Sequence, residues 1–376
     1  MANAQTRLAP NAIPSAYSAV CRAKADWLIG INATRLFSVL YHKTLNVGRV
    51  QTPTLNMLVE RDGKISTFKK EKYHIVHIGA GGAEAESARI SDAAEAHKLK
   101  TACEASQAVC VSVVRERKME QPPKLFDLTT LQREANRLYG FTAKQTLDYA
   151  QGLYEKRLIT YPRTDSRFLT DDMAQAAAGI VAGVLPLLPF AQGAELTPDM
   201  GRILNSAKVS DHHAIIPTEQ FVDLTHMTID ERRIYDLVVR RFLAVLYPPC
   251  EYEQTEITVR AGEELFTAHG NVIKEAGWRA VENLDGGMEA DSEDAGGDGS
   301  SAAGQILPDL KEGDVLQGVS FAMTEGKTKP PAHFNEATLL SAMENPVAYM
   351  ESQDKAMAKT LGDTGGLGTV ATRADI

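Results

Sequence analysis

The residues with the clearest chemical potential lie in one short segment, 157–167, which reads Arg-Leu-Ile-Thr-Tyr-Pro-Arg-Thr-Asp-Ser-Arg. Its two apolar residues predict a short buried strand, and Pro162 ends that strand because proline has no N–H to donate. A tyrosine hydroxyl, with a pKa of about 10, is a poor nucleophile unless a cation stabilises its developing charge. Arg163 suits that task for Tyr161, and it also suits bidentate binding of a phosphate. The spacing alone fits a strand-to-turn corner with a surface tyrosine equally well.

A second segment with chemical potential is 211–218, Asp-His-His-Ala-Ile-Ile-Pro-Thr. Paired histidines in an aliphatic setting suggest a proton carrier or a phosphate donor. A metal site is the competing interpretation, but it needs a third ligand at a characteristic spacing, and none is evident. Two structural loop histidines are a further alternative. We predict no metal site in this chain.

Two other segments favour phosphate binding at a helix start. In 46–62, Gly48 permits close approach of the backbone, and Thr52 predicts a cap for a helix that begins at Pro53. Arg49 and Gln51 flank this helix start, where N–H groups attract anions. The last residues, 365–376, predict a glycine-rich lead into a helix whose first turn carries hydroxyls and an arginine.

Helices must position these segments. Apolar residues at three- and four-residue spacing predict a long helix or helix pair over 15–41, and further helices over 91–100, 130–139, 142–156, 171–185, 230–247 and 335–345. Thr142 and Gln145 form a capping-box pattern. The helices 130–139 and 142–156, with the strand after them, are typical of a helix-turn-helix or winged-helix unit, although plain helical hairpins share the pattern.

Strands are predicted elsewhere in the chain. Alternating or continuous apolar residues predict strands over 73–78, 109–114, 252–260, 264–269, 276–281 and 314–323, with a turn at Gly79–Gly82. Residues 283–304 are acidic and of low complexity, which predicts a flexible loop.

Composition restricts the class of protein without deciding its function. The 376 residues are 44% hydrophobic and 24% charged, as in an ordinary multidomain globular protein. We find no apolar run long enough to span a membrane and no signal peptide, and the four cysteines form no Cys-x-x-Cys pair, so we expect a reducing cytoplasm. The net charge is −9, yet residues 1–66 carry eight Lys or Arg against three Asp or Glu. A locally basic surface can still bind a polyanion.

Five segments in order resemble the type IA DNA topoisomerases, most closely the bacterial topoisomerase III branch. They are 22–35 (RAKADWLIGINATR), 48–55 (GRVQTPTL), 158–166 (LITYPRTDS), 211–218 (DHHAIIPT), and the pair 329–339 (KPPAHFNEATL) with 366–373 (GLGTVATR). Together they cover nearly the whole length, and five matches in register are a specific signal.

The resemblance implies an α+β multidomain fold, a fragment of the type IA torus. Residues 1–66 and 321–376 would form a helical DNA-binding domain (domain IV in two parts). Residues 67–120 and 249–320 would form the β-rich arch (domain II in two parts). Residues 121–248 would form domain III, a winged-helix-like domain with the catalytic tyrosine.

The resemblance also implies roles for residues. Tyr161 would attack a single-strand phosphodiester and keep the 5′ phosphate as a phosphotyrosyl ester, with Arg163 and His212 as the other catalytic residues. The predicted DNA-binding residues are Arg22, Asp26, Arg35, Arg49, Gln51, Thr52, Asp165, Ser166, Lys208, His213, Thr372 and Arg373. The implied partners are single-stranded DNA and negatively supercoiled DNA in the cytoplasm, at the bacterial nucleoid.

One departure from the family pattern concerns Mg²⁺. Family members begin with a Toprim module whose acidic residues bind that ion, and no Asp-x-Asp cluster precedes the first helical segment here. We therefore expect the Mg²⁺ ligands to lie outside this chain, a separate Toprim-containing polypeptide as a partner, and little relaxation activity by this chain alone. The zinc-ribbon tail of some relatives is also missing.

Two hypotheses follow. The first is an ATP-independent topoisomerase core that cleaves single-stranded DNA and passes strands. The alternative is a non-catalytic single-stranded DNA-binding protein derived from that family. A covalent adduct that depends on Tyr161 would separate them.

Overall fold

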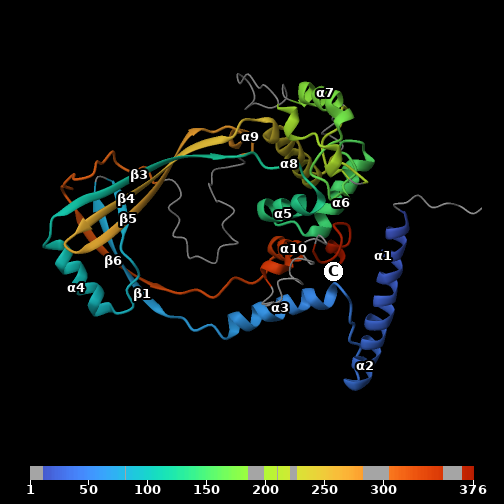
Figure 1. Ribbon diagram of the computed structural model, residues 1–376, viewed down its shortest axis with the longest axis horizontal. Helices are drawn as coiled ribbons and strands as arrows, with labels where there is room; N and C mark the ends of the chain where they lie inside the picture. The colour runs from blue at the N-terminus through green and yellow to red at the C-terminus, as the bar shows by residue number, and fades with distance from the viewer. Residues whose placement is uncertain are drawn as a thin grey trace, which may run out of the picture. The chain divides into compact units, whose positions relative to one another are not determined.

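The computed structural model describes residues 12–80, 82–184, 199–209, 211–220, 227–282, 305–349 and 366–376 (Figure 1). The chain divides into two compact units. Unit 1 comprises Met1–Gly63 with His333–Ile376, and unit 2 comprises Lys64–Ala332. Helices and one antiparallel sheet make up the described residues, which confirms the predicted α+β class. The predicted acidic loop 283–304 lies outside the described residues.

Unit 1 begins with the predicted helical stretch. It consists of α1 (Ala12–Ala25), one π-helical segment (Asp26–Ile31) and α2 (Asn32–Leu40). The Asn32 side chain donates to the Leu28 carbonyl (3.0 Å), which satisfies one backbone acceptor that the wider π-helical turn leaves open. No residue of the π-helical segment or of α2 is buried. The apolar residues whose spacing predicted this helix therefore do not form a core in this structure.

The core of unit 1 joins helices from opposite ends of the sequence. Met57 in α3 (Gln51–Ser66) packs with Ala342 and Met343 in α10 (Glu336–Glu344). A capping box between Asn335 and Thr338 begins α10 close to the predicted residue. Beyond it, residues 366–376 contain only a short 3-10 turn, Arg373–Asp375, where the sequence predicted the start of a helix.

The sheet of unit 2 has six antiparallel strands in the order β3-β4-β5-β2-β1-β6. They are β1 (Lys72–Ala80), β2 (Ala83–Glu86), β3 (Ala108–Glu120), β4 (Cys250–Ala261), β5 (Glu264–Glu275) and β6 (Ser320–Lys327). Figure 1 shows β3, β4 and β5 as long strands that run side by side. Gly262 turns β4 into β5 with a positive φ, which a residue with a side chain adopts at a cost.

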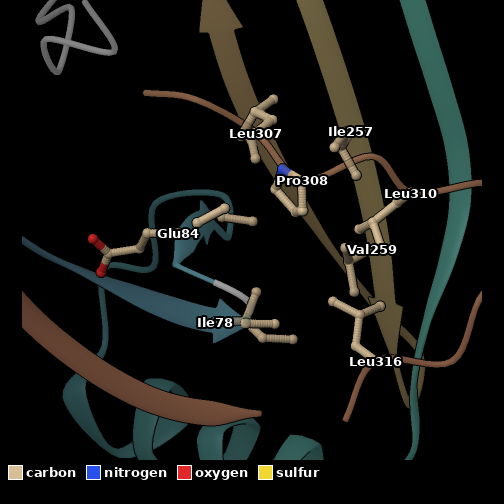
Figure 2. A pocket seen from close by; sticks show the side chains of 12 residues that line it. Ile78, Glu84, Ile257, Val259, Leu307, Pro308, Leu310 and Leu316 are labelled. Atoms are coloured by element: carbon tan, nitrogen blue, oxygen red, sulfur yellow. The ribbon is translucent and has the colours of Figure 1, made fainter. Parts of the chain in front are cut away.

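One face of the sheet is buried by α4 (Ala93–Glu104) and by apolar residues of 305–319. The Asp92 side chain accepts from two N–H groups at the start of α4, so it caps this helix. A small apolar pocket of about 20 Å³ remains between the sheet and the 307–316 segment. Figure 2 shows Ile257, Val259, Leu307 and Leu316 around it, with the Glu84 carboxylate turned away. The lining of the pocket is almost entirely apolar.

Two predictions about the sheet were wrong. Residues 276–281 do not form a strand, because β5 ends at Glu275 and a short helix, α9 (Arg279–Glu282), follows. The strand predicted over 314–323 lies further along, as β6, and pairs with β1 over its whole length. The domain boundary predicted at residue 321 therefore falls inside a strand of the sheet.

The rest of unit 2 is helical and carries the largest core. It contains α5 (Leu128–Tyr139), α6 (Ala143–Glu155), α7 (Ala174–Val184) and α8 (Ile229–Leu246). The predicted capping box of α6 is present, and α5 ends at Gly140 in the left-handed conformation. Leu131, Leu153, Ile159, Ile215 and Phe242 are among its fully buried residues. None of the described helices is both long enough and apolar enough to cross a membrane.

Candidate active site

The turn after α6 sets the direction of the segment that contains the predicted nucleophile, Tyr161. The N–H of Leu158 donates to the Leu153 carbonyl (2.9 Å), and the N–H of Arg157 donates to the Tyr154 carbonyl (2.8 Å). Arg157 has φ +61°, the left-handed conformation that glycine normally supplies at a helix end. This reversal sends 158–161 away from the helix as an extended segment.

The extended segment is held against residues 214–218. Thr160 donates its N–H to the Ile216 carbonyl (3.0 Å), and its hydroxyl donates to the Ala214 carbonyl (3.0 Å). The N–H of Ile216 donates to the same hydroxyl (3.0 Å), and Ile159 forms a bridge with Pro217. Side-chain and backbone bonds of Thr160 thus fix the register between the tyrosine segment and the histidine segment.

This register brings the predicted catalytic rings together. The ring centroids of Tyr161 and His212, which lie far apart in sequence, are 4.6 Å apart with the planes tilted by 51°. Tyr154 approaches the Tyr161 ring edge-on, with centroids 5.3 Å apart. Tyr161 is half-buried and His212 is exposed, so the Tyr161 ring lies between two aromatic neighbours near the surface.

Thr164 fixes the backbone on the other side of the pair. Its buried hydroxyl donates to the His212 carbonyl (2.9 Å) and accepts from the Ser166 N–H (3.1 Å). Its carbonyl accepts from the N–H of Leu128 at the start of α5 (3.0 Å). The side chain and the carbonyl of this one residue therefore connect the loop after Tyr161, the histidine segment and a core helix.

The remaining predicted residues of this region differ in their surroundings. Arg163, Asp165 and Lys208 are exposed. Ser166 is buried, and its hydroxyl lies 3.2 Å from the Lys208 and Phe168 carbonyls, so it shapes the turn. The half-buried His213 donates from Nδ1 to the Ala214 carbonyl (2.9 Å). Of the predicted DNA contacts here, Ser166 and His213 both use their side chains in hydrogen bonds within the protein.

In unit 1, Arg49 and Asp26 form a bidentate ion pair; the second bond, from Nη2 to Oδ2, is 3.1 Å. The hydrogen bond from Arg49 holds the pKa of Asp26 below its ordinary value, and the charges of Arg49 and Arg22 act in the same direction. The same bond raises the pKa of Arg49. Three predicted DNA-binding residues, Arg22, Asp26 and Arg49, are thus brought together on the surface of unit 1.

The Thr52 prediction was wrong in its local detail. Helix α3 begins at Gln51, and the Thr52 hydroxyl accepts from the N–H of Gly48 (3.0 Å) instead of capping a helix that begins at Pro53. Thr52 therefore holds the Gly48 turn that presents Arg49. Gln51 is exposed at the helix start, and Arg35 is exposed on α2.

The two predicted contacts near the chain's last residues are used within unit 1. Arg373 is 5% exposed, and its guanidinium donates to the Leu367 carbonyl (3.0 Å) and to Glu344 (3.4 Å). The Thr372 hydroxyl donates to the Thr369 carbonyl (3.2 Å). In this structure Arg373 ties residues 366–376 to α10, a geometry that does not favour contact with DNA.

Sequence reasoning missed Tyr154, Thr160 and Thr164. Tyr154 lies at the end of α6, and only the left-handed turn at Arg157 brings its ring back to Tyr161. The two threonines belong to the segment that the motif marks, yet their partners lie some fifty residues away. The available signal in the sequence is a threonine on either side of the predicted nucleophile, since a hydroxyl there can hold the segment by hydrogen bonds.

A metal ion has no cluster of ligands among the described residues. No three of their His, Cys, Asp or Glu side chains are arranged so that they could hold one. The residues that the structure describes therefore do not fit Mg²⁺.

Comparison with known proteins identifies the family. A family model described as "DNA topoisomerase" matches residues 12–376. Proteins named DNA topoisomerase 3 from Bacillus licheniformis and Bacillus subtilis are 44% and 43% identical to this chain, in alignments of 373 positions that cover 96% of it. The chain spans about half the length of these curated relatives, since it covers 50% of each.

A solved structure supports the fold. Full-length topoisomerase I from Thermotoga maritima matches with a TM-score of 0.69 and 24% identity, over 95% of this chain and 54% of that one. At that identity the likeness shows the fold alone, and the family rests on the sequence matches. The chain therefore belongs to the type IA DNA topoisomerase family and is similar to its topoisomerase III members.

Proposed function

We propose that this chain is the strand-cleaving core of a type IA DNA topoisomerase, with Tyr161 as the nucleophile. The observation that carries the proposal is the contact between the Tyr161 and His212 rings at 4.6 Å. The two residues come from separate segments, which Thr160 and Thr164 hold in register. A surface tyrosine at a turn would not need this support.

The proposed reaction exchanges one phosphate ester for another. The Tyr161 oxygen loses its proton and attacks the phosphorus of a single-strand phosphodiester. The bond from phosphorus to the 3′ oxygen breaks, and that oxygen takes up a proton as it leaves. The 5′ phosphate stays on Tyr161, and the reverse reaction reseals the strand without ATP.

Arg163 and His212 would act on the phosphate. Negative charge grows on the non-bridging oxygens in the transition state, and a cation or N–H donor placed there stabilises it more than it stabilises the ground state. Arg163 follows Tyr161 by two residues and is exposed, and the exposed His212 touches the nucleophile's ring. An arginine can bind two phosphate oxygens at once, which lysine cannot do in the same geometry.

Residues other than those described here would bind Mg²⁺. The relatives' family implies this ion, which as a divalent cation neutralises phosphate charge, whereas the described residues offer no cluster to hold it. We propose that a Toprim module, which the described residues do not include, provides the ion. The side chains argued here contribute the nucleophile and the contacts with phosphate.

Unit 1 would hold the single strand. Its predicted contacts Arg22, Arg49 and Gln51 are exposed, and Asp26 sets the orientation of Arg49 through two hydrogen bonds. Because the pair occupies Arg49, a phosphate would have to share its guanidinium with Asp26. Binding of DNA to such cations weakens as the salt concentration rises.

The test is formation of a covalent DNA adduct. The chain is incubated with labelled single-stranded DNA, Mg²⁺ and a separately produced Toprim polypeptide, and the products are separated under denaturing conditions. We expect an adduct with the 5′ end of the cleaved strand that Tyr161→Phe abolishes. Arg163→Ala and His212→Ala should each slow its formation by about 10²–10³-fold.

A matched control makes the outcome decisive. Tyr149 lies in α6 and is half-buried, as Tyr161 is. Tyr149→Phe removes its hydroxyl and should leave the adduct intact. An adduct that survives Tyr161→Phe would contradict the proposal. Single-strand binding without any adduct would favour a non-catalytic DNA-binding protein.

A further inference from the structure

A cationic patch lies close to the candidate active site and has no part in the proposed chemistry. The Lys208 ammonium is 4.9 Å from the centroid of the Phe168 ring, and the Lys124 ammonium is 5.6 Å from the same centroid. Both lysines are exposed, and Phe168 is half-buried. Three segments that are distant in sequence thus place two cations on one aromatic ring.

The Phe168 ring is held in position by its backbone. Its N–H donates to the Ser166 hydroxyl (3.2 Å), and its carbonyl accepts from the Ala214 N–H (3.0 Å). Phe168 therefore belongs to the segment that carries Tyr161, and its carbonyl is bonded to the segment that carries His212. Ala214 follows His212 by two residues, and two extended residues span about 7 Å. The Ala214 bond therefore keeps the Phe168 ring close enough to Tyr161 for a few nucleotides of one strand to reach both.

The two lysines of the patch lie in segments without acidic residues. The segments 122–126, 166–169 and 206–209 contain Lys124, Arg167 and Lys208, and the nearest acidic residues in the sequence are Asp127, Asp165 and Asp211. Arg167 is bound to the buried Asp127, which leaves the two lysines. Within the part of the chain that the structure describes, neither ammonium forms an ion pair. The ring stabilises each cation weakly, and an anion between the two would stabilise both.

We propose that Lys124, Phe168 and Lys208 form a subsite for single-stranded DNA, in which one base stacks on Phe168 and the neighbouring phosphates bind the two ammonium groups. An aromatic ring that is partly exposed beside cations is the combination that binds unpaired strands, since every base has a face to stack. The bases of a duplex are already stacked on one another. The inference rests on the proposed function, because it assigns this patch to the strand that Tyr161 cleaves.

The test measures binding without cleavage. Fluorescence anisotropy follows a labelled oligo-dT, in EDTA, over a series of salt concentrations, for the full chain and its variants. Lys124→Gln with Lys208→Gln should weaken binding about tenfold and make the slope of log K against log salt shallower by about 1.4, the value for two phosphates on a single strand. Phe168→Leu should weaken binding about tenfold without changing that slope, because stacking involves no counterion.

Matched variants control for folding and for charge. Phe168→Tyr keeps a stacking ring and should bind within about twofold of the wild type. Lys98→Gln with Lys100→Gln makes the same change of charge on α4 and should leave the slope unchanged. Circular dichroism melting curves show whether each variant is folded.

Several results would overturn the subsite. One is a salt slope that the control pair changes as much as the Lys124 and Lys208 pair does, and another is wild-type affinity in Phe168→Leu. The subsite also fails if the variants lose duplex binding as much as oligo-dT binding, or if the wild type does not bind oligo-dT. Failure of the proposed function looks different. If no covalent adduct forms but oligo-dT binding depends on these three residues, the subsite stands and the cleavage proposal fails.

Discussion

At the scale of single residues, the nucleophile is defined by what surrounds its ring. Tyr161 contacts His212 on one side and Tyr154 approaches its ring edge-on, and both neighbours are themselves exposed. An in-line attack needs the reacting oxygen within a fraction of an ångström of its position. A ring with two aromatic neighbours has fewer orientations available than a free surface tyrosine.

The role of Tyr154 can be separated from that of its hydroxyl. Tyr154→Phe keeps the edge-on contact and should form the covalent adduct at close to the wild-type rate. Tyr154→Leu removes the ring and should slow adduct formation about tenfold or more, with DNA affinity unchanged, because orientation and not binding is lost. Tyr154 is exposed, so the melting temperature should fall by only a few degrees.

The measurement is a single-turnover rate at saturating DNA, which reports the chemical step. A fluorotyrosine label at position 161, observed by NMR, gives a readout that does not require activity. Its resonance should shift and broaden in Tyr154→Leu and not in Tyr154→Phe. Equal rates for the two variants would show that the ring contact has no positioning role.

At the scale of elements, the end of α6 combines strain with function. Arg157 adopts the left-handed conformation where glycine is usual, and its carbonyl accepts from the Thr218 hydroxyl (2.5 Å). Arg157→Gly should raise the free energy of unfolding by about 0.5 kcal/mol, since relief of strain exceeds the added entropy of the unfolded chain. Arg157→Ala keeps the strain and should not stabilise. Urea unfolding curves measure both, and a stabilised alanine variant would refute the argument.

The contact between α6 and α8 depends on a carboxylate. Burial alone would raise the pKa of Glu231, but hydrogen bonds from Lys156 (2.7 and 2.8 Å) and Thr228 outweigh it, so the pKa lies below the ordinary value. A pKa lowered by folding contributes stability above the unfolded-state value, and the contribution is lost as the pH falls through the folded value. We therefore expect Glu231 to stabilise unit 2 at neutral pH and to lose this effect in acid.

Glu231→Gln tests that sign. At pH 7 the variant should unfold with about 1 to 2 kcal/mol less free energy than the wild type, because a buried hydrogen-bonded charge is removed. Below the folded pKa of Glu231 the two proteins should converge. Urea titrations at a series of pH values measure the difference, and the exposed Glu263→Gln serves as the control. A difference that grows in acid would contradict the assigned direction.

Sequence reasoning succeeded where the signal was local or came from the family motif. The α6 capping box and the pairing of helices from both ends of the chain in unit 1 follow from residues that adjoin one another or from the resemblance. It failed over the cap at Thr52, whose hydroxyl bonds to Gly48 four residues away, and over β6, whose position is set by its pairing with the distant β1. It also gave no sign that Arg373 is buried against Glu344. Such pairings have no periodicity that a single sequence reveals.

At the scale of the whole molecule, the two units differ in how much core they bury. Unit 2 contains a large cluster around α5, α6 and α8 and a second one on the sheet. Among the described residues of unit 1, the cluster has three buried members, Met57, Ala342 and Met343. Unfolding should therefore not follow a single two-state transition, since cores of such unequal size rarely open together.

Hydrogen exchange should resolve this difference. Amides of α8, which has eleven buried residues, should exchange only through global unfolding of unit 2. Those of the π-helical segment and α2, which bury no residue, should exchange orders of magnitude faster. Mass spectrometry of the full chain measures both. If α2 were protected as strongly as α8, its exposed apolar residues, such as Leu36, Val39 and Leu40, would have to be covered in solution. Protection that appeared only with single-stranded DNA present would instead assign the ordering of this helix to the bound strand.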